Sequence, residues 1–398
     1  MSGSLQGLHV LVVDDNPNIV ALLKRYLATV GVAAAQEAHD GSGALEQIDA
    51  TPLDLVLCDL DMPGMDGIEL LRHLAARQDP PAVILLSGQE RSILNTAVRL
   101  GRAHGLRVVG ALSKPFRLPP LRALLEQAAA GADSLSRARL EPLSPEAVRA
   151  GIGRGAVELA FQPKVAAGSG TLAGVETFLR WRDTDGRLKH PAAVVPVAER
   201  SGLIHELTRV VVRRAMKQQA AWQAQGHRFT IAINVSMRDL ERYDFPEFVV
   251  AAAEDAGIEL SSVLLEVTES QIMADVVRPL EVLSRLRLKG VGLSIDDYGT
   301  GASSMQQLKR IPFTELKIDR EFVSGAPEDP EAQAMLSSSI TLGKDLGLAI
   351  VAEGVETASE WDLVVSRGVD IVQGYFVARP MAAMAMTEWL SRQRQTLH

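Results

Sequence analysis

Three acidic residues near the start of the chain have the types and spacing of a phospho-acceptor pocket. Asp14, Asp15 and Asp59 each follow or end a short apolar run. Neighbouring carboxylates repel one another, and Mg²⁺, which prefers oxygen ligands, would relieve that repulsion. With the metal present, Asp59 could attack a phosphoryl donor as a carboxylate nucleophile, while Ser87 and Lys114 bind the phosphoryl oxygens. The alternative is that these acids only end strands at a solvated edge, but all five residues in this order favour the pocket.

A second and larger polar set lies at the ends of apolar runs in residues 157–380. Its members are Glu176, Asn234, Glu266, Glu269, Asp296, Asp297, Lys317, Glu353, Glu356 and Gln373. Buried carboxylates at this density are costly unless metals or partners neutralise them. Adjacent strand residues point to opposite faces, so Asp296 and Asp297 reach one site only near a strand end. There one carboxylate could bridge two divalent cations, an arrangement suited to phosphodiester hydrolysis.

Several of these residues suggest separate roles in such a reaction. Lys317 could orient the attacking water or offset charge, and Glu353 is a candidate general base. Arg180 could grip a phosphate in bidentate fashion, although Arg180 and Trp181 could also be a stacked structural pair. Gln162 could read a base edge. Individually, the acids could be ordinary surface residues, Asn234 a cap and Lys317 a simple salt bridge, but seven strands supplying one end oppose that interpretation.

Residues 8–128 must place the first set through alternating strands and helices. Apolar runs at 9–15, 53–64, 82–88 and 106–116 read as strands, and residues 18–31 have helical spacing. This alternation predicts an α/β domain with a doubly wound parallel sheet, in which ligands sit at the carboxyl ends of the strands.

Residues 146–398 must place the second set, after a linker predicted at 129–145. The candidate strands span 157–165, 173–182, 228–236, 263–270, 292–299, 313–320, 348–355 and 371–380. Eight strands separated mostly by amphipathic segments predict a TIM-type (β/α)8 barrel, whose chemistry lies at the carboxyl ends of its strands.

Composition limits the class of protein. The 398 residues are 47% hydrophobic and 23% charged, as in an ordinary globular protein, and the net charge is −8. The acidity argues against a duplex-DNA surface, no apolar run is long enough for a membrane span, and no secretory signal is present. A single cysteine, Cys58, excludes an internal disulfide. These features favour a cytoplasmic location.

Residues 8–128 resemble the receiver domain of two-component response regulators, which has a flavodoxin-like fold. The matching residues are DD at 14–15, DLDMPGMDG at 59–67, Ser87 and SKP at 113–115. The resemblance implies Asp59 as phospho-acceptor, one Mg²⁺ held with Asp14 and Asp15, and a sensor histidine kinase or other phosphoryl donor as partner. Receivers usually place Tyr or Phe where this chain has Ala111, so the usual route of signal output is altered here.

Residues 145–390 resemble EAL-domain cyclic di-GMP phosphodiesterases. The matching motifs are QPKV at 162–165, AERSGLI at 198–204, INVS at 233–236, EVTES at 266–270, DDYGTG at 296–301, KIDR at 317–320, VAEGVE at 351–356 and QGYFVARP at 373–380. The resemblance implies hydrolysis of cyclic di-GMP to linear pGpG with two Mg²⁺ or Mn²⁺ ions, and a homodimer or larger assembly.

The same resemblance assigns the site residues. The implied metal ligands are Glu176, Asn234, Glu266, Asp296 and Asp297, the implied catalytic residues are Lys317, Glu353 and Glu269, and the implied substrate contacts are Gln162, Arg180, Glu356 and Gln373. Glu269 would brace the loop that follows Asp297.

Two departures from the EAL pattern leave alternatives open. The signature Glu-Ala-Leu reads Glu176-Thr177-Phe178, and Ala302 stands where the family commonly has an aromatic residue. A phosphodiesterase gated by phosphorylation at Asp59 is the leading hypothesis. A non-hydrolytic cyclic di-GMP sensor or a partner-binding output is the second. A DNA-binding response regulator is the third, opposed by the acidic second half and the lack of a helix-turn-helix signal.

Overall fold

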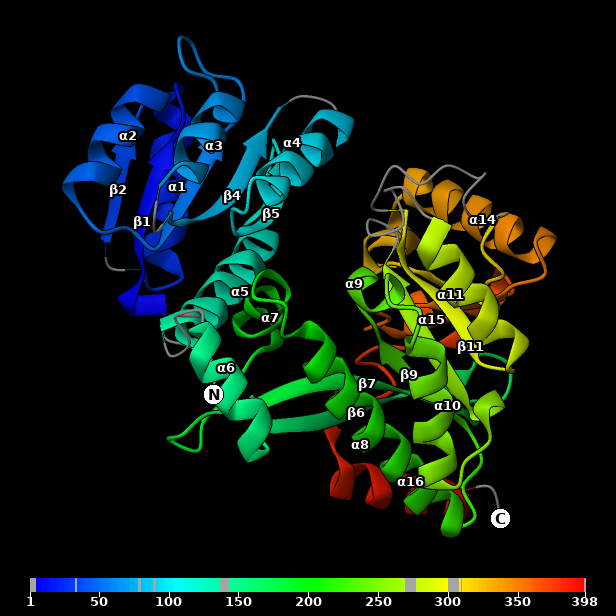
Figure 1. Cartoon of the computed structure of the whole chain (residues 1–398). Helices are drawn as coiled ribbons and strands as arrows, with labels where there is room; N and C mark the ends of the chain where they lie inside the picture. Colours follow the sequence, from blue (N-terminus) through cyan, green and yellow to red (C-terminus); the bar gives the residue numbers. More distant parts are fainter. Residues whose placement is uncertain are drawn as a thin grey trace. The chain divides into compact units, whose positions relative to one another are not determined.

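The computed structural model describes two compact units, Met1–Arg139 and Leu140–His398, each of which is taken by itself below (Figure 1). The described residues are 5–32, 34–77, 80–88, 91–136, 143–268, 277–299, 308 and 310–396. Helix α5 continues to Ser136, into the segment predicted as a linker, and helix α6 begins at Pro145.

The first unit is a five-stranded parallel sheet in the order β2-β1-β3-β4-β5, as in flavodoxin-like folds. The strands are β1 (His9–Val13), β2 (Ala34–Ala38), β3 (Leu55–Asp59), β4 (Ala82–Ser87) and β5 (Val108–Ser113). The helices are α1 (Pro17–Thr29), α2 (Gly41–Ala50), α3 (Gly67–Ala75), α4 (Arg91–Ala103) and α5 (Leu118–Ser136), after a short 3-10 turn at Leu5–Gly7. This confirms the doubly wound sheet.

Buried apolar strands and polar helix starts explain this arrangement. Strands β3 and β4 are buried along their whole length, and alternate residues feed separate cores on the two faces of the sheet. The side chains of Asn16, Asp40 and Asp66 accept hydrogen bonds from the first turns of α1, α2 and α3, so these helices begin just beyond strand ends or turns. The carboxyl ends of β1, β3, β4 and β5 therefore meet at one edge.

The second unit is a closed barrel of eight strands, as predicted. They are β6 (Val157–Ala166), β7 (Leu172–Arg182), β9 (Thr230–Asn234), β10 (Val263–Thr268), β11 (Gly292–Tyr298), β12 (Glu315–Ile318), β13 (Ala349–Ala352) and β14 (Ile371–Val372). The short strands β8 (Leu188–Lys189) and β15 (Met381–Ala382) pair in antiparallel fashion with β7 and β6. Pairing of β6 with β7 closes the barrel.

One strand departs from the regular (β/α)8 pattern, because β6 runs antiparallel to both of its barrel neighbours. Only five residues, 167–171, connect β6 to β7. A connection this short allows a hairpin, whereas a parallel pair needs a crossover of a dozen or more residues. The other strands from β7 to β14 are parallel, so their carboxyl ends share one side, which we call the barrel mouth.

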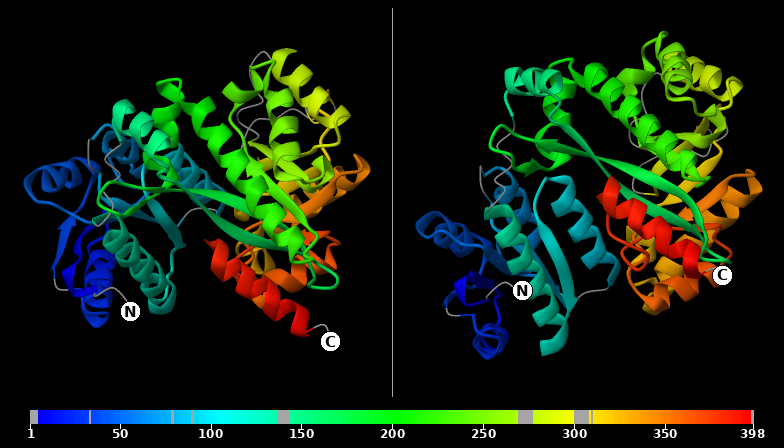
Figure 2. Two further views of the ribbon diagram at one scale, coloured as in Figure 1. Left: turned by 60° about the horizontal axis from the view of Figure 1, so that its bottom comes forward. Right: turned by 90° about the horizontal axis from the view of Figure 1, so that it is seen from below.

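Helices pack around the outside of these strands (Figure 2). They are α6 (Pro145–Arg154), α7 (Val195–Arg200), α8 (Ile204–Ala224), α9 (Met237–Leu240), α10 (Phe245–Ala256), α11 (Val277–Leu288), α13 (Arg320–Val323), α14 (Pro330–Asp345), α15 (Ala358–Ser366) and α16 (Ala383–Thr396). Trp222 of α8 anchors this layer, since its ring lies 4.8 Å from that of Phe161 and 5.6 Å from that of Phe229. None of the helices among the described residues has the length and hydropathy to cross a membrane.

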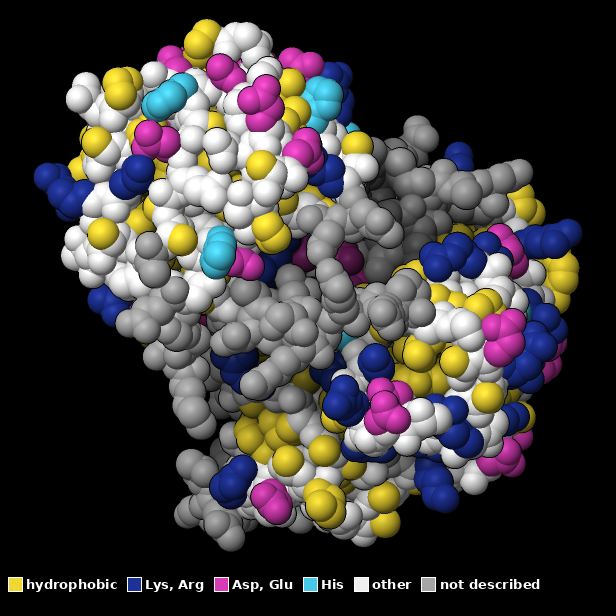
Figure 3. All heavy atoms as spheres, turned by 90° about the vertical axis from the view of Figure 1, so that its left-hand side faces the viewer, with side chains coloured by type: hydrophobic (Ala, Val, Ile, Leu, Met, Phe, Trp, Pro, Cys, Tyr) yellow, Lys and Arg dark blue, Asp and Glu magenta, His cyan; other side chains and the backbone are white. Residues whose placement is uncertain are grey.

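Charges of both signs are mixed on the surface. On the face drawn in Figure 3, Lys and Arg side chains lie among Asp, Glu and hydrophobic ones. Several surface cations are paired, as in the contacts of Lys24 with Glu37 (2.7 Å) and Arg209 with Asp244 (2.7 Å). Such exposed pairs add little to the free energy of unfolding. The charged groups that matter more for function are those buried inside the two units.

Candidate functional site

The sheet edge of the first unit brings the predicted pocket residues together. Asp14 follows β1, Asp59 ends β3, Ser87 ends β4 and Lys114 follows β5. Oxygens of Asp14, Asp15 and Asp59 lie within 4.8 Å of one another. Asp14, Asp59 and Ser87 are buried, whereas Asp15 is exposed, which leaves the group open to solvent on one side.

Lys114 lies between two of these carboxylates. Its Nζ is 2.8 Å from Asp14 Oδ2 and 2.7 Å from Asp59 Oδ2. The backbone N–H of Lys114 donates to Ser87 O at 2.7 Å, and this bond fixes the two predicted phosphoryl-binding residues side by side. The Lys114–Pro115 peptide bond is cis.

The electrostatics of this pocket fit a divalent cation. Burial raises the pKa of Asp59, against the opposing effect of Lys114. Burial alone would lower the pKa of Lys114, but hydrogen bonds to Asp14 and Asp59 raise it. Among the described residues, Asp59 Oδ1 is buried and accepts no hydrogen bond. A buried carboxylate oxygen without a partner beside two other acids is a ready ligand for Mg²⁺.

The barrel mouth gathers most of the second predicted set around one ammonium group. Lys317, on β12, is almost completely buried. Its Nζ lies 3.2 Å from Glu176 Oε2, 3.2 Å from Glu266 Oε1, 2.9 Å from Asp296 Oδ1 and 2.7 Å from Glu353 Oε1. Strands β7, β10, β11 and the residue after β13 supply the four carboxylates, so residues far apart in the sequence meet here.

Amide side chains link the carboxylates into a network. Gln373 Nε2 donates to Glu176 Oε2 at 2.7 Å and to Gln162 Oε1 at 3.0 Å. Asn234 Nδ2 donates to Glu176 Oε1 at 3.1 Å and to Glu266 Oε2 at 3.3 Å. The orientation of both carboxylates is therefore set before any ligand arrives.

The Asp296–Asp297 pair turns toward one site because the strand is irregular there. The pairing of β11 with β12 shifts register between Ile295 and Tyr298, and Asp297 has a positive φ of 56°. That left-handed backbone is uncommon outside glycine, with Asp among the more tolerant residues. Oxygens of Asp296, Asp297 and Glu353 lie within 4.8 Å of one another, as do those of Glu176, Glu266 and Asp296. Asp296 belongs to both groups.

Burial of so many acids shifts their protonation. Burial, with the charge of Glu176, raises the pKa of Glu266 to about 8, against the effect of Lys317 and Lys164. Burial, with the charge of Asp296, raises the pKa of Asp297 to about 6. Burial also raises the pKa of Glu353 well above its ordinary value. Added positive charge would favour the ionised forms, which is the electrostatic condition of a divalent metal site.

Two of the predicted substrate contacts, Arg180 and Glu356, have partners outside the acidic network. Arg180 is on the same strand and face as Glu176, where its guanidinium donates to Leu179 O at 2.8 Å and lies 5.9 Å from the Phe178 ring. Trp181 is buried on the opposite face of β7, against Gly151 of α6, so its ring and the Arg180 guanidinium lie on different sides of the strand. Glu356 is joined to Arg320 at 3.1 Å. Glu269 and Ala302 lie outside the described residues.

Sequence reasoning missed two charged residues inside the barrel, Lys164 and Glu315. Lys164 Nζ lies 3.2 Å from Glu315 Oε1 and 3.4 Å from Glu266 Oε1. The signal was present, because Lys164 stands two residues after Gln162 and therefore faces the same side of β6. A lysine between Pro163 and Val165 does not by its type indicate burial, because lysine side chains are mostly exposed.

Comparison with known families decides the class of the chain. Residues 10–126 match the response regulator receiver domain, and residues 145–380, more than half of the chain, match the EAL domain. The chain belongs to the EAL domain family. It combines this EAL domain with an N-terminal receiver domain, as the sequence motifs indicated.

Characterised relatives share this organisation in whole or in part. The chain is 32% identical over 392 residues to the cyclic di-GMP phosphodiesterase RocR of Pseudomonas aeruginosa, with 97% of this chain and 100% of RocR covered. It is 39% identical over 237 residues to the bifunctional diguanylate cyclase/cyclic di-GMP phosphodiesterase MucR of the same organism, with 59% of this chain and 35% of MucR covered.

Solved structures of EAL proteins have the same barrel. The PaMucR phosphodiesterase in a c-di-GMP complex is 38% identical, with a TM-score of 0.58, and the match covers 61% of this chain and 98% of that one. The EAL enzyme Bd1971 in its cAMP- and cyclic-di-GMP-bound form is 27% identical, also with a TM-score of 0.58, over 68% of this chain and 75% of that one.

The altered EAL tripeptide keeps its glutamate in the acidic network. Glu176 points into the barrel, so its neighbour Thr177 faces the opposite side of β7, where it is buried. Phe178, two residues after Glu176, faces the same side of β7 as Glu176 and is half-buried beside Arg180. The residue at 177 therefore alters packing on the outer side of β7, and Phe178 alters the apolar surroundings of Arg180, while Glu176 keeps its place in the acidic network.

Proposed function

We propose that the EAL domain hydrolyses cyclic di-GMP to linear pGpG with two divalent cations, Mg²⁺ or Mn²⁺. The observation that carries this proposal is the pair of overlapping carboxylate groups at the barrel mouth, which share Asp296. The metal ligands are Glu176, Asn234, Glu266, Asp296 and Asp297. When bound, the two cations stabilise the charge that develops during an in-line displacement at phosphorus.

The chain's own residues position the substrate and move the proton. Glu353 accepts a proton from the attacking water, whose oxygen forms a bond to phosphorus while the P–O bond to the 3′ oxygen breaks. Lys317, 2.7 Å from Glu353, offsets the negative charge of the reacting group. The leaving 3′ oxygen takes up a proton from solvent, and the product carries a 5′ phosphate. Glu269, which lies outside the described residues, has a supporting role in this proposal.

The substrate contacts lie around the network. Gln162 and Gln373, already joined to each other, present amide groups that suit a guanine edge. Arg180 reaches the phosphate in the proposed complex, because it lies on the same strand face as Glu176, four residues further along. Glu356, held by Arg320 at the rim, contacts the outer part of the nucleotide.

The receiver domain controls this activity in our proposal. Asp59 accepts a phosphoryl group from a sensor histidine kinase or another donor, with one Mg²⁺ held by Asp14, Asp15 and Asp59. Ser87 and Lys114 bind the phosphoryl oxygens. The signal reaches the EAL domain through a change in domain placement or in a homodimer or larger assembly. Support comes from the buried, unpartnered Asp59 Oδ1 and from the adjacent cation.

Product analysis tests the reaction. Purified protein is mixed with cyclic di-GMP and Mg²⁺ or Mn²⁺, and the nucleotides are separated by chromatography, with Glu176→Ala as the control. Linear pGpG from the wild type alone supports the proposal. Binding measured by calorimetry, with no product under either metal and in either phosphorylation state, would favour the non-hydrolytic sensor.

A further inference from the structure

The interior of the barrel is charged one layer below the mouth, where barrels usually hold bulky branched side chains. Lys164 is fully buried, and Glu315 is 6% exposed. In the β6–β7 pairing, Gln162 is opposite Glu176, whereas Lys164 is opposite Gly174, which in turn pairs with Thr230 at the start of β9. Lys164 therefore lies toward the amino ends of the parallel strands, beneath the acidic network.

The surrounding residues make room for this ion pair and hold it. A β-carbon on Gly174 would lie 2.5 Å from Thr230 Oγ1 and 3.5 Å from Lys164 Cε. The glycine therefore leaves room for the aliphatic part of the Lys164 side chain. Ser294 Oγ donates to Glu315 Oε1 at 2.9 Å, the same oxygen that faces Lys164. Glu315 is thus fixed from two sides.

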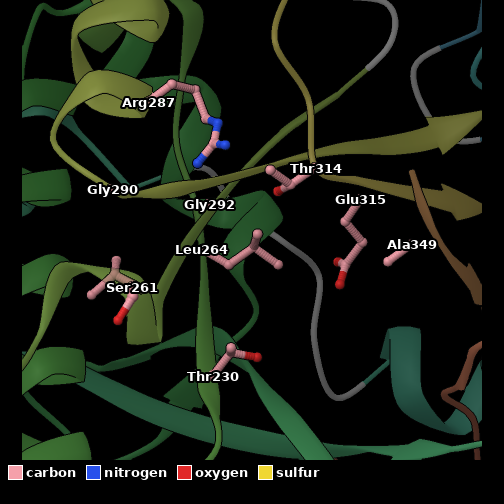
Figure 4. A pocket seen from close by; sticks show the side chains of 10 residues that line it. Thr230, Ser261, Leu264, Arg287, Gly290, Gly292, Thr314, Glu315 and Ala349 are labelled. Carbon is pink, nitrogen blue, oxygen red and sulfur yellow. The ribbon is translucent and has the colours of Figure 1, made fainter. Parts of the chain in front are cut away.

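A cavity of about 280 Å³ lies under the pair, at the amino ends of the barrel strands. Thr230, Gly292 and Ala349, which begin β9, β11 and β13, line it together with Thr314 and Glu315 (Figure 4). Glu315 therefore lines this cavity on one side and contacts Lys164 on the other. The Nζ atom of Lys164, which contacts Glu315, also lies 3.4 Å from Glu266 Oε1.

We propose that Lys164, braced by Glu315, is a positioning residue for Glu266. Lys164 and Lys317 both contact Glu266 Oε1, so Oε2 is left on the side of Asn234, 3.3 Å away, where the mouth lies. This inference rests on the proposed function, in which Glu266 binds a divalent cation. Partners behind a metal ligand commonly change metal affinity or activity by about 10- to 100-fold when removed.

Paired substitutions separate positioning from folding. Lys164→Met alone leaves Glu315 buried with its charge unbalanced, which destabilises a protein strongly, whereas replacing both partners by apolar residues of similar volume is often neutral. The decisive variant is therefore the double substitution Lys164→Met/Glu315→Met. Glu315→Gln keeps the size of the side chain and an acceptor oxygen, but it removes the negative charge that attracts Lys164. Gln219→Met, which removes a buried polar side chain of α8 outside the barrel interior, is the matched control.

The readout is the Mn²⁺ dissociation constant of the metal-free full chain, measured by calorimetry, beside kcat and KM. Glu266→Ala gives the binding that remains at the receiver pocket and at the group of Asp296, Asp297 and Glu353. We expect the double variant to bind Mn²⁺ at the mouth about 10- to 100-fold more weakly, Glu315→Gln to show a smaller loss, and Gln219→Met to bind as the wild type does.

Two results would overturn the inference in different ways. A folded double variant with wild-type Mn²⁺ affinity and kcat would show that the pair is merely structural, and the proposed function would stand. Equal Mn²⁺ binding by the wild type and Glu266→Ala would remove Glu266 from the metal site, and the proposed function would fail together with the inference.

Discussion

At the scale of single residues, the barrel mouth depends on carboxylates whose protonation is set by burial. Four of them surround the ammonium group of Lys317, and two amides fix the orientation of Glu176 and Glu266. Glu353 differs from the others because it follows β13 and is only partly buried. That position suits a group that exchanges a proton with water.

Replacing Glu353 tests its role as the base. Glu353→Gln should lower kcat by about 10²- to 10⁴-fold, the usual contribution of a general acid or base, while the melting temperature and Mn²⁺ binding change little. Formation of pGpG, thermal unfolding and calorimetry give the three values. Glu281→Gln, at an exposed position on α11, is the control. Unchanged kcat in Glu353→Gln would exclude the assignment.

The raised pKa of Glu266 predicts how stability depends on pH in the metal-free protein. The pKa is about 8 in the folded chain and 4.5 as the ordinary value, so the folded state binds more protons between these limits. Stability should therefore fall as pH rises from about 5 to 8, and Glu353 adds an effect of the same sign. Lys164 and Lys317, with raised pKa values, stay protonated throughout this window.

Thermal unfolding in chelator at a series of pH values measures this slope, and added Mn²⁺ should offset it. Glu266→Gln, which carries no titrating group at this position, should flatten the curve. A slope of the opposite sign, or one that Glu266→Gln leaves unchanged, would contradict the account.

Most residues of the site could be predicted because strand ends are visible in the sequence. Apolar runs that stop at an acid mark Asp14, Asp59 and Asp296 without any structure. Lys164 and Glu315 could not be paired in this way, because their contact depends on the register between β6 and strands more than a hundred residues away. The sequence pattern places each on an inward face but does not say which layer they share.

At the scale of elements, strand existence was predicted better than strand length. The last barrel strand was predicted at 371–380, but β14 is only Ile371–Val372. The chain turns immediately afterwards, as the backbone N–H groups of Val377 and Ala378 donate to Gly374 O. The apolar and aromatic residues at 375–378 have the composition of a strand. The turn at Gly374 becomes visible only in the three-dimensional structure.

Gly374 brings two mouth loops together. A β-carbon there would lie 2.0 Å from Val355 O and 2.4 Å from Val355 N. Gly374→Ala should therefore separate the loops that carry Glu353 and Gln373, lower kcat at least tenfold and cost about 1–3 kcal/mol, as overpacking usually does. Chemical denaturation and product formation measure the two effects.

Gly153→Ala in α6 is the matched control, because an added β-carbon meets nothing within 4 Å at that position. It should keep wild-type kcat and stability or gain slightly, since alanine favours a helix. If Gly374→Ala behaves in the same way, close contact of the two loops is not needed for turnover.

At the scale of the whole molecule, the chain joins a receiver domain to an EAL domain, and the order of the two was visible in the motifs. The antiparallel β6 was not predicted, because a run of alternating residues does not show strand direction. Ala111, on β5 of the receiver domain, packs with the core beside α4 and leaves no aromatic ring at the position where receivers usually have one.

Phosphorylation should act through Asp59 despite that departure. Wild-type turnover should change when the protein is treated with a small-molecule phosphoryl donor such as acetyl phosphate, and Asp59→Asn should remove the response while keeping basal turnover. Initial rates of pGpG formation with and without the donor provide the comparison. A response that persists in Asp59→Asn would place the acceptor elsewhere.

The central claim is that the EAL domain hydrolyses a cyclic dinucleotide with water and divalent metal. Its most direct test is to incubate the chain with cyclic di-GMP and Mg²⁺ or Mn²⁺ in water enriched in oxygen-18 and to identify the products by mass spectrometry. The account predicts linear pGpG with the heavy isotope in its new phosphate, and none from Glu176→Ala. Intact cyclic di-GMP after incubation with both phosphorylated and unphosphorylated wild type would contradict it.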